Sequence, residues 1–157
     1  MVNAKISDKE LKDFSEEHLY YEIYMLLASS QRLLAKRDDE VVFNALLESF
    51  VVHAYNLLDF FYKPQIKPDD AKAAHYIKDF AAWKKVLPAY ESYFRHFNKR
   101  RNREVTHLTY KRLEVRGDAK AWQVRDTSEK IRKIIGIFLN NADPSLIHPK
   151  FNEFKTK

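Results

Sequence analysis

The segment spanning residues 39–62 constrains the fold more than any other part of the chain. Apolar residues recur in it at spacings of three and four, which is the repeat of one face of an α-helix. The resulting wide stripe consists of Val42, Phe43, Leu46, Leu47, Phe50, Ala54, Leu57, Leu58 and Phe61. A helix with so broad an apolar face has to pack against several others. We therefore expect it to be the central helix of the core, with Phe50 and Leu57 buried.

The same periodicity predicts three further long helices. One covers residues 8–36 and follows Ser7–Glu10, whose sequence SDKE matches a capping box. Another begins near Pro88 and continues into residues 98–112. The last covers residues 122–141, and its inward face is expected to contain Val124, Ile131, Ile134, Ile135 and Phe138.

The length and composition favour one helical domain. The 157 residues are enough for a single core, and two glycines are too few for the tight turns of an all-β fold. We predict an all-α, antiparallel four- to five-helix bundle over residues 1–157, with about 143–157 as a C-terminal tail. Short helices around residues 70–76 and 79–87 are expected to cap one end, and the tail is expected to pack through Leu146, Ile147 and Phe151.

Several functional classes are disfavoured by what the sequence lacks. There is no cysteine, which rules out disulfides and thiolate metal sites and suits a reducing compartment. We find no signal-peptide pattern, no apolar run near the roughly 20 residues that span a bilayer, no metal-ligand spacing and no Gly-rich phosphate loop. We therefore expect a cytoplasmic protein with no metal, no cofactor and no membrane contact.

Most of the positive charge lies in residues 98–112, NKRRNREVTHLTYKR. The formal net charge of the chain is +6, and this stretch contributes +5, from six cations and Glu104. Such a cluster is either a solvated helix face or a surface for phosphates. If RNA binds, we expect the phosphate contacts to come from Arg100, Arg103, Lys111 and Arg112.

Arg101 is the anomaly of this stretch, because it falls in the middle of an apolar stripe. The other members of the stripe are Tyr90, Phe94, Phe97, Val105 and Leu108. An unpaired guanidinium cannot be fully buried there, since desolvating its charge is too unfavourable. Arg101 could snorkel or pair with an acid such as Glu48 or Asp59. Alternatively, the helix could change phase, or the stripe could open onto a pocket or a second subunit.

The pattern Arg101-Asn102-x4-His107 combines a permanent cation, an amide and a titratable base. These groups can hold a phosphate, orient it and move a proton. On one ideal helix the directions of Arg101 and His107 differ by about 120°. A helix irregularity, the long reach of arginine or a second copy of the chain is needed to bring them to one substrate.

The sequence RNREVTH at residues 101–107 resembles the motif of HEPN domains, in which a polar residue follows an arginine and a histidine follows four to six residues after the arginine. It is similar to the R-N/D-K-x-x-A-H form of the abortive-infection AbiU2-like branch, with Arg103 where lysine is common and Thr106 where alanine is common. The resemblance covers nearly the whole chain, because the chain is expected to be an all-helical domain with the motif late in a long helix.

The resemblance implies a homodimer that brings two motifs together and, in catalytic members, metal-independent RNA cleavage by a toxin or antiphage factor with a possible antitoxin partner. His107 would act as general acid or base, Arg101 would stabilise charge on the phosphate, and Asn102 would orient either group. Because other members only bind, a non-catalytic dimeric module for RNA, a nucleotide or an acidic protein stays open. Sequence-specific DNA binding is disfavoured, since no helix-turn-helix pattern is present.

Overall fold

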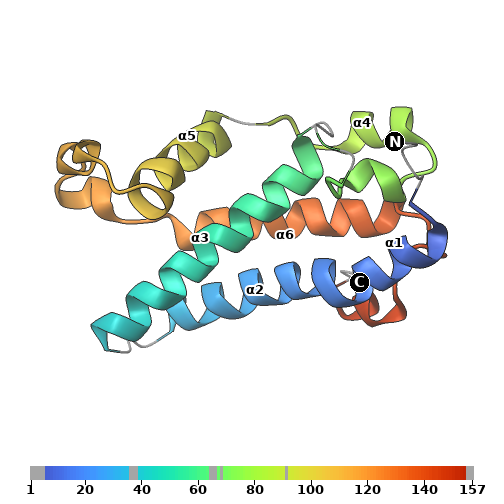
Figure 1. Ribbon diagram of the computed structural model, residues 1–157, viewed down its shortest axis with the longest axis horizontal. Helices are drawn as coiled ribbons and strands as arrows, with labels where there is room; N and C mark the ends of the chain where they lie inside the picture. Colours follow the sequence, from blue (N-terminus) through green and yellow to red (C-terminus); the bar gives the residue numbers. More distant parts are fainter. Residues whose placement is uncertain (1–5, 36–38, 64–66, 68, 91, 155–157) are drawn as a thin grey trace.

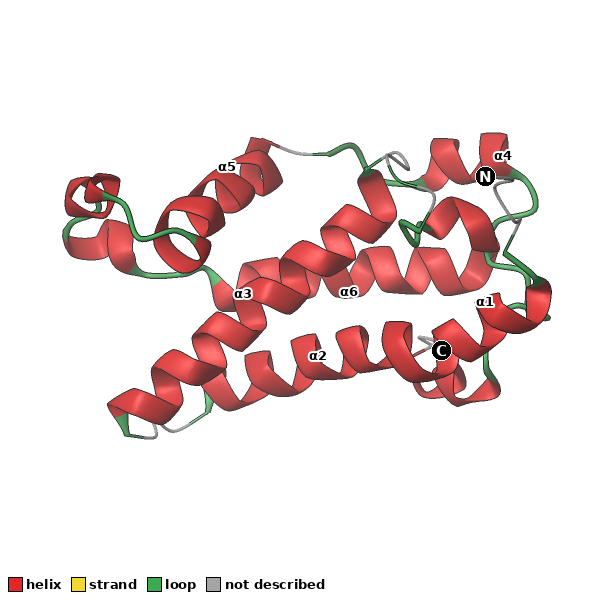
Figure 2. Ribbon diagram, in the orientation of Figure 1, coloured by secondary structure: helices red, strands yellow, loops and turns green. Residues whose placement is uncertain are grey.

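The computed structural model describes residues 6–35, 39–63, 67, 69–90 and 92–154. Within these ranges the chain forms six α-helices, two π-helices and four 3₁₀ turns, and no β-strand (Figure 2). The predicted all-α helical bundle is thus confirmed. A single isolated bridge joins Ile77 to Ala142 in the described part of the chain.

The N-terminal helix is one rod with an irregular turn in the middle. It comprises α1 (Asp8–Phe14), the π-helix η1 (Ser15–Leu19) and α2 (Tyr20–Leu34). The predicted capping box is present: the Glu10 carboxylate accepts from the Ser7 amide at 2.8 Å, and the Ser7 hydroxyl accepts from the Glu10 amide at 3.3 Å. These bonds satisfy amides that the first turn cannot pair internally.

The central helix is α3 (Glu40–Tyr62), and it turns back along α2 (Figure 1). The Asp39 carboxylate caps it by accepting from the amides of Val41 and Val42 at 2.9 and 3.2 Å. Phe50 and Leu57 are buried as predicted. Of the described helices, α3 alone has the length and apolar composition of a bilayer-spanning segment, but a helix in a protein core can have the same length and composition.

The outer part of α3 departs from the prediction. Residues 40–49 include no buried side chain, and Val42 is 39% exposed although it belongs to the predicted core stripe. The physical reason is the length of the neighbouring helices, because Figure 1 draws the start of α3 farther to the left than the start of α6 (Val124–Asn141). The start of α3 therefore presents an apolar face that α6 does not cover.

The core is organised around the ring of Phe138 on α6, which is fully buried. Its centroid lies 5.5–6.1 Å from four other aromatic rings, those of Phe60, Phe61, Tyr76 and Trp83. The rings of Tyr76 and Trp83 come from η2 (Ala73–Tyr76) and α4 (Phe80–Val86), the short elements expected to close one end. The C-terminal turn η6 (Pro149–Phe154) buries Phe151, and Leu146 and Ile147 are buried before it.

The helix carrying the motif, α5 (Ser92–Arg101), packs on α3 and continues into the π-helix η3 (Asn102–Thr106). Two 3₁₀ turns follow, η4 (Tyr110–Glu114) and η5 (Gly117–Lys120), before the chain returns to α6. Figure 1 shows these turns projecting from the bundle at its left end. Gly117 has a φ of +55°, a left-handed conformation that suits the break predicted there.

Candidate functional site

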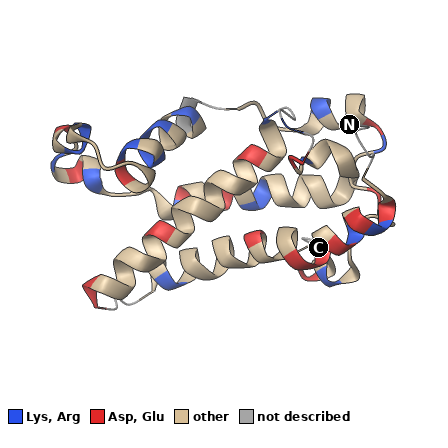
Figure 3. Cartoon of the chain, viewed as in Figure 1, with Lys and Arg blue, Asp and Glu red and all other residues tan. Residues whose placement is uncertain are grey.

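Figure 3 shows a concentration of basic residues on α5 and the turns that follow it. Arg100 and Arg101 are consecutive there, yet the structure gives them opposite environments. Arg100 is 8% exposed, and its Nε donates to both Glu104 carboxylate oxygens at 2.8 and 2.9 Å. Its Nη atoms donate to the carbonyls of Ala121 and Lys120 at 2.7 and 2.6 Å, and its guanidinium lies 4.1 Å from the Trp122 ring centroid.

Arg100 is therefore a structural clamp between the end of α5 and the approach to α6. All three of its guanidinium nitrogens are already hydrogen-bonded inside the chain. The sequence places Arg100 among the expected phosphate contacts, but the residue is 8% exposed and each of its guanidinium nitrogens already donates to a group of the same chain. Its role is therefore structural.

Arg101 is half-buried, and its guanidinium carbon lies 3.5 Å from the ring centroid of Tyr55 on α3. Its Nε is buried without a hydrogen-bond partner, and no carboxylate of the described residues pairs with it. Asp59, named among the alternatives as a possible partner, does not pair with Arg101, because that carboxylate binds the ammonium groups of Lys63 and Lys72, each at 2.5 Å. Stacking on the aromatic ring replaces the ion pair.

The surroundings of Tyr55 carry an excess of positive charge. Lys63 Nζ lies 4.6 Å from the ring centroid and donates to the Tyr55 hydroxyl at 2.7 Å. Burial by itself would raise the pKa of Asp59, but its bonds to Lys63 and Lys72 hold that pKa below the ordinary value. The ionised Asp59 thus pairs with two cations, Lys63 and Lys72. Arg101 lies on the nearby Tyr55 ring without a carboxylate partner among the described residues, so cations outnumber Asp59 in this cluster.

The change of helix phase comes directly after Arg101. The π-helix covers Asn102–Thr106, and His107 is the first residue beyond it, with an extended backbone and an exposed side chain. Asn102 is also exposed, and its carbonyl accepts from the Thr106 hydroxyl at 3.2 Å. In the described parts of one chain, no hydrogen bond or ion pair links the side chains of Arg101, Asn102 and His107.

The remaining basic residues of the motif region differ in how free they are. Arg103 is half-buried and pairs with Glu104 at 3.3 Å and with Glu114 at 3.5 Å. Arg112 Nε donates to the carbonyls of Arg103 and His107, both at 3.2 Å, and so ties the turn η4 to the π-helix. Lys111 is exposed, and none of the described residues bonds to it. Leu108, the last member of the predicted apolar stripe, is 91% exposed because the helix ends before it.

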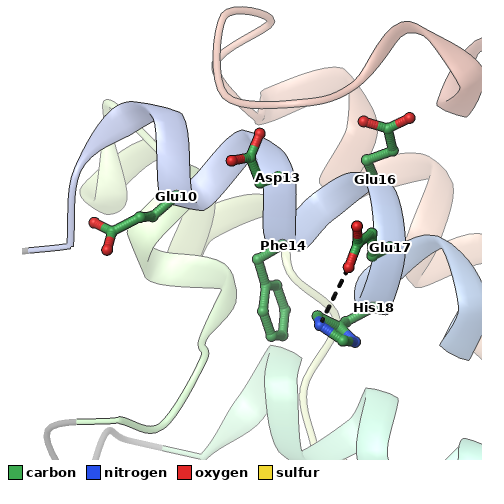
Figure 4. A pocket seen from close by; sticks show the side chains of 6 residues that line it. All are labelled: Glu10, Asp13, Phe14, Glu16, Glu17 and His18. Atoms are coloured by element: carbon green, nitrogen blue, oxygen red, sulfur yellow. Dashed lines mark ion pairs between the residues drawn. The ribbon is translucent and has the colours of Figure 1, made fainter.

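A second feature, not expected from the sequence, is a pocket of about 420 Å³ on the N-terminal helix (Figure 4). Its lining residues are Glu10, Asp13, Phe14, Glu16, Glu17 and His18. Figure 4 marks an ion pair between His18 Nε2 and Glu17 at 3.9 Å. In the described ranges, no group of three or more ligating side chains could hold a metal ion. Since the carboxylates repel phosphate, this face is unsuited to nucleic acid.

Two partners of the arginines were missed by sequence reasoning. Tyr55, on which Arg101 stacks, lies at the edge of the apolar stripe of α3, and Trp122, on which Arg100 stacks, precedes α6. No local pattern signals either contact. The pair of Arg100 with Glu104, four residues apart, is the one part of this arrangement that the spacing contains.

No family model matches this chain, and no curated protein and no solved structure is significantly similar to it. The function therefore has to be argued from the residues and the geometry described above.

Proposed function

We propose that the chain is a metal-independent endoribonuclease of the HEPN type that acts as a homodimer. The observation that carries the proposal is Arg101, a half-buried cation fixed against Tyr55 with no carboxylate partner among the described residues. A preorganised, uncompensated charge of this kind stabilises negative charge that develops on a phosphate. His107 follows within the same motif and exposes its imidazole to solvent.

The chemistry assigned to these residues is transesterification at the ribose. A His107 imidazole takes the proton of the 2′-hydroxyl, the 2′-oxygen bonds to phosphorus, and the bond from phosphorus to the 5′-oxygen breaks. The leaving oxygen receives a proton from the other His107, which acts as an imidazolium acid. Arg101 neutralises the phosphate as its charge rises. The products are a 2′,3′-cyclic phosphate and a 5′-hydroxyl, so no metal-bound water is needed.

The homodimer is part of the proposal because one chain does not join its own Arg101 and His107. The apolar face at the start of α3 supports it, since Val41 is 77% and Leu34 at the end of α2 is 42% exposed. Figure 1 draws the start of α3 and the end of α5 toward the same end of the molecule. Phe94 is buried inside the subunit and is therefore not available to a dimer interface.

The test is cleavage of total RNA by the pure protein in the presence of EDTA. We expect wild type to cut, and His107→Ala to reduce the rate by about 10²–10⁴-fold, the usual contribution of general acid–base catalysis. Arg101→Ala should weaken both cutting and binding. His18→Ala, at an exposed histidine on η1, is the matched control and should cut like wild type. A His107→Ala variant as fast as wild type would refute the assignment.

A non-catalytic, cytoplasmic RNA-binding module is the second candidate. The observation that favours it is that no described group hydrogen-bonds the His107 imidazole, whereas catalytic histidines are commonly oriented by a partner. In that case Lys111, Arg112 and Arg103 hold RNA through its phosphates, and an acidic antitoxin protein could compete for them. Wild type that binds RNA tightly but leaves it intact, with or without added divalent metal, would decide for this candidate.

A further inference from the structure

The turn η4 and the residues just before it carry the two most exposed large apolar side chains of the described residues. Tyr110 is 93% and Leu108 is 91% exposed, and Leu113 in the same segment is 68% exposed. Isolated exposed apolar residues are common, but three within six positions of one projecting segment are unusual. Nothing inside the described subunit covers the Tyr110 ring.

The turn that carries Tyr110 is nevertheless fixed in position. Arg112 Nε holds the carbonyls of Arg103 and His107, and Arg103 pairs with Glu114 at the end of the turn. Val115, directly after it, is 7% exposed and anchors the segment. The Tyr110 ring is therefore presented on a braced support rather than on a free loop, which lowers the entropy lost when a ligand stacks on it.

The charge around the ring identifies the ligand. Between residues 107 and 120 the chain has four cations and two carboxylates, the cations being Lys111, Arg112, Arg116 and Lys120. An exposed aromatic ring followed along the chain by several cations suits unpaired nucleotides, whose bases stack on the ring while their phosphates pair with the cations. A bilayer would also have to accommodate the carboxylates of Glu114 and Asp118 in the same turns, which disfavours a membrane.

Resting on the proposed function, we propose that Tyr110 stacks on an unpaired base beside the Arg101–His107 motif, so that the chain takes single-stranded and not duplex RNA. The bond from Arg112 to the His107 carbonyl places this turn directly next to the motif. The bases of an RNA duplex are already stacked on each other and offer no free face to the ring.

The experiment measures binding of a short 2′-O-methyl RNA, which cannot be cleaved because its 2′-oxygen carries no proton. Tyr110→Ala should weaken binding of the single strand about 5- to 150-fold, the usual effect of losing one stacked base. Tyr110→Phe keeps the ring and should stay within about twofold. Tyr24→Ala, at a 51% exposed tyrosine on α2, is the control and should bind like wild type. A blunt duplex of the same length should bind weakly and respond little to Tyr110→Ala.

A crosslinking arm locates the base directly. In a single strand with 5-iodouracil at one position, light should join the base to Tyr110, and mass spectrometry of the digested protein should find the adduct on residues 108–112. Unchanged single-strand affinity in Tyr110→Ala, or duplex binding as tight as single-strand binding, would overturn this inference. So would capture of the protein by phosphatidylserine vesicles, lost in Tyr110→Ala, without RNA binding.

The two proposals fail separately. If Tyr110→Ala binds like wild type while His107→Ala abolishes cleavage, only the stacking role is lost. If Tyr110→Ala loses single-strand binding while wild type cuts no RNA, the stacking role stands and the nuclease is refuted.

Discussion

Arg100 and Arg101 differ so much in environment that replacing each by alanine should lower the stability of the fold by very different amounts. Arg100→Ala removes one partner of an ion pair whose two side chains are only 9% and 15% exposed. Breaking a buried ion pair costs about 3–5 kcal/mol, and the residual exposure of Arg100 and Glu104 sets the cost here at about 3 kcal/mol. Losing the contact with the Trp122 ring adds about 1 kcal/mol. The carbonyls of Lys120 and Ala121 belong to exposed residues, so water replaces their bonds.

The expected loss of unfolding free energy for Arg100→Ala is thus about 4 kcal/mol, much of a typical domain's total. Arg101→Ala loses only its contact with Tyr55, about 1 kcal/mol, and also removes a buried Nε that has no partner. With a urea dependence of about 2 kcal/mol per molar, the unfolding midpoints should fall by about 2 M and about 0.5 M. Far-UV circular dichroism during urea titration measures both. Equal shifts, or a larger shift for Arg101→Ala, would refute the assignment of Arg100 as the clamp.

Three further outcomes are expected. Phe138→Ala should cost about 3–5 kcal/mol in urea titration because it removes the ring at the centre of the core, whereas Phe80→Ala, at a 43% exposed position, should stay within about 0.5 kcal/mol. Hydrogen bonds to the Asp143 carboxylate, the strongest from Lys78 and the next from Ser145, lower the pKa of Asp143 from 3.8 to about 2. The ionised carboxylate therefore stabilises the fold fully above pH 3.8, and this contribution is lost as the pH falls through about 2. Asp143→Asn should flatten the acid side of a stability–pH curve over that range. RNA affinity should fall steeply with salt, and Lys111→Gln should reduce the slope of log affinity against log salt by about 1; a slope equal to that of wild type would remove Lys111 from the interface.

The helical framework could be predicted because it depends on local pattern. The capping box at Ser7, the cap at Asp39 and the inward face of α6 are all set by residues within a few positions of each other. The outer part of α3 could not be predicted, because an apolar stripe records which face is apolar and not how far the neighbouring helix extends. Only the assembled fold places residues 40–49 beyond the reach of α6.

The candidate site depended on tertiary contacts and was predicted only in part. A helical wheel indicates Arg101 as the arginine on the apolar stripe, but the buried one is Arg100, whose partners at Lys120 and Ala121 lie twenty residues further on. The wheel also assumes one uniform repeat, whereas the π-helix changes the phase after Arg101 and His107 lies outside the helix. The roles of Arg101, Asn102 and His107 in chemistry stay predictions.

The Arg100 clamp has a consequence for how the chain can vary. Its bonds to the carbonyls of Lys120 and Ala121 bring the two ends of the projecting segment together at the edge of the bundle, and Trp122 covers the junction. For a loop closed in this way, doubling the length adds only about 0.6 kcal/mol of closure entropy. Insertions or exchanges between residues 107 and 117 should therefore leave the packing of α2, α3 and α6 intact. Residues 107–117 could therefore be replaced to change the ligand preference without redesigning the helices that support them.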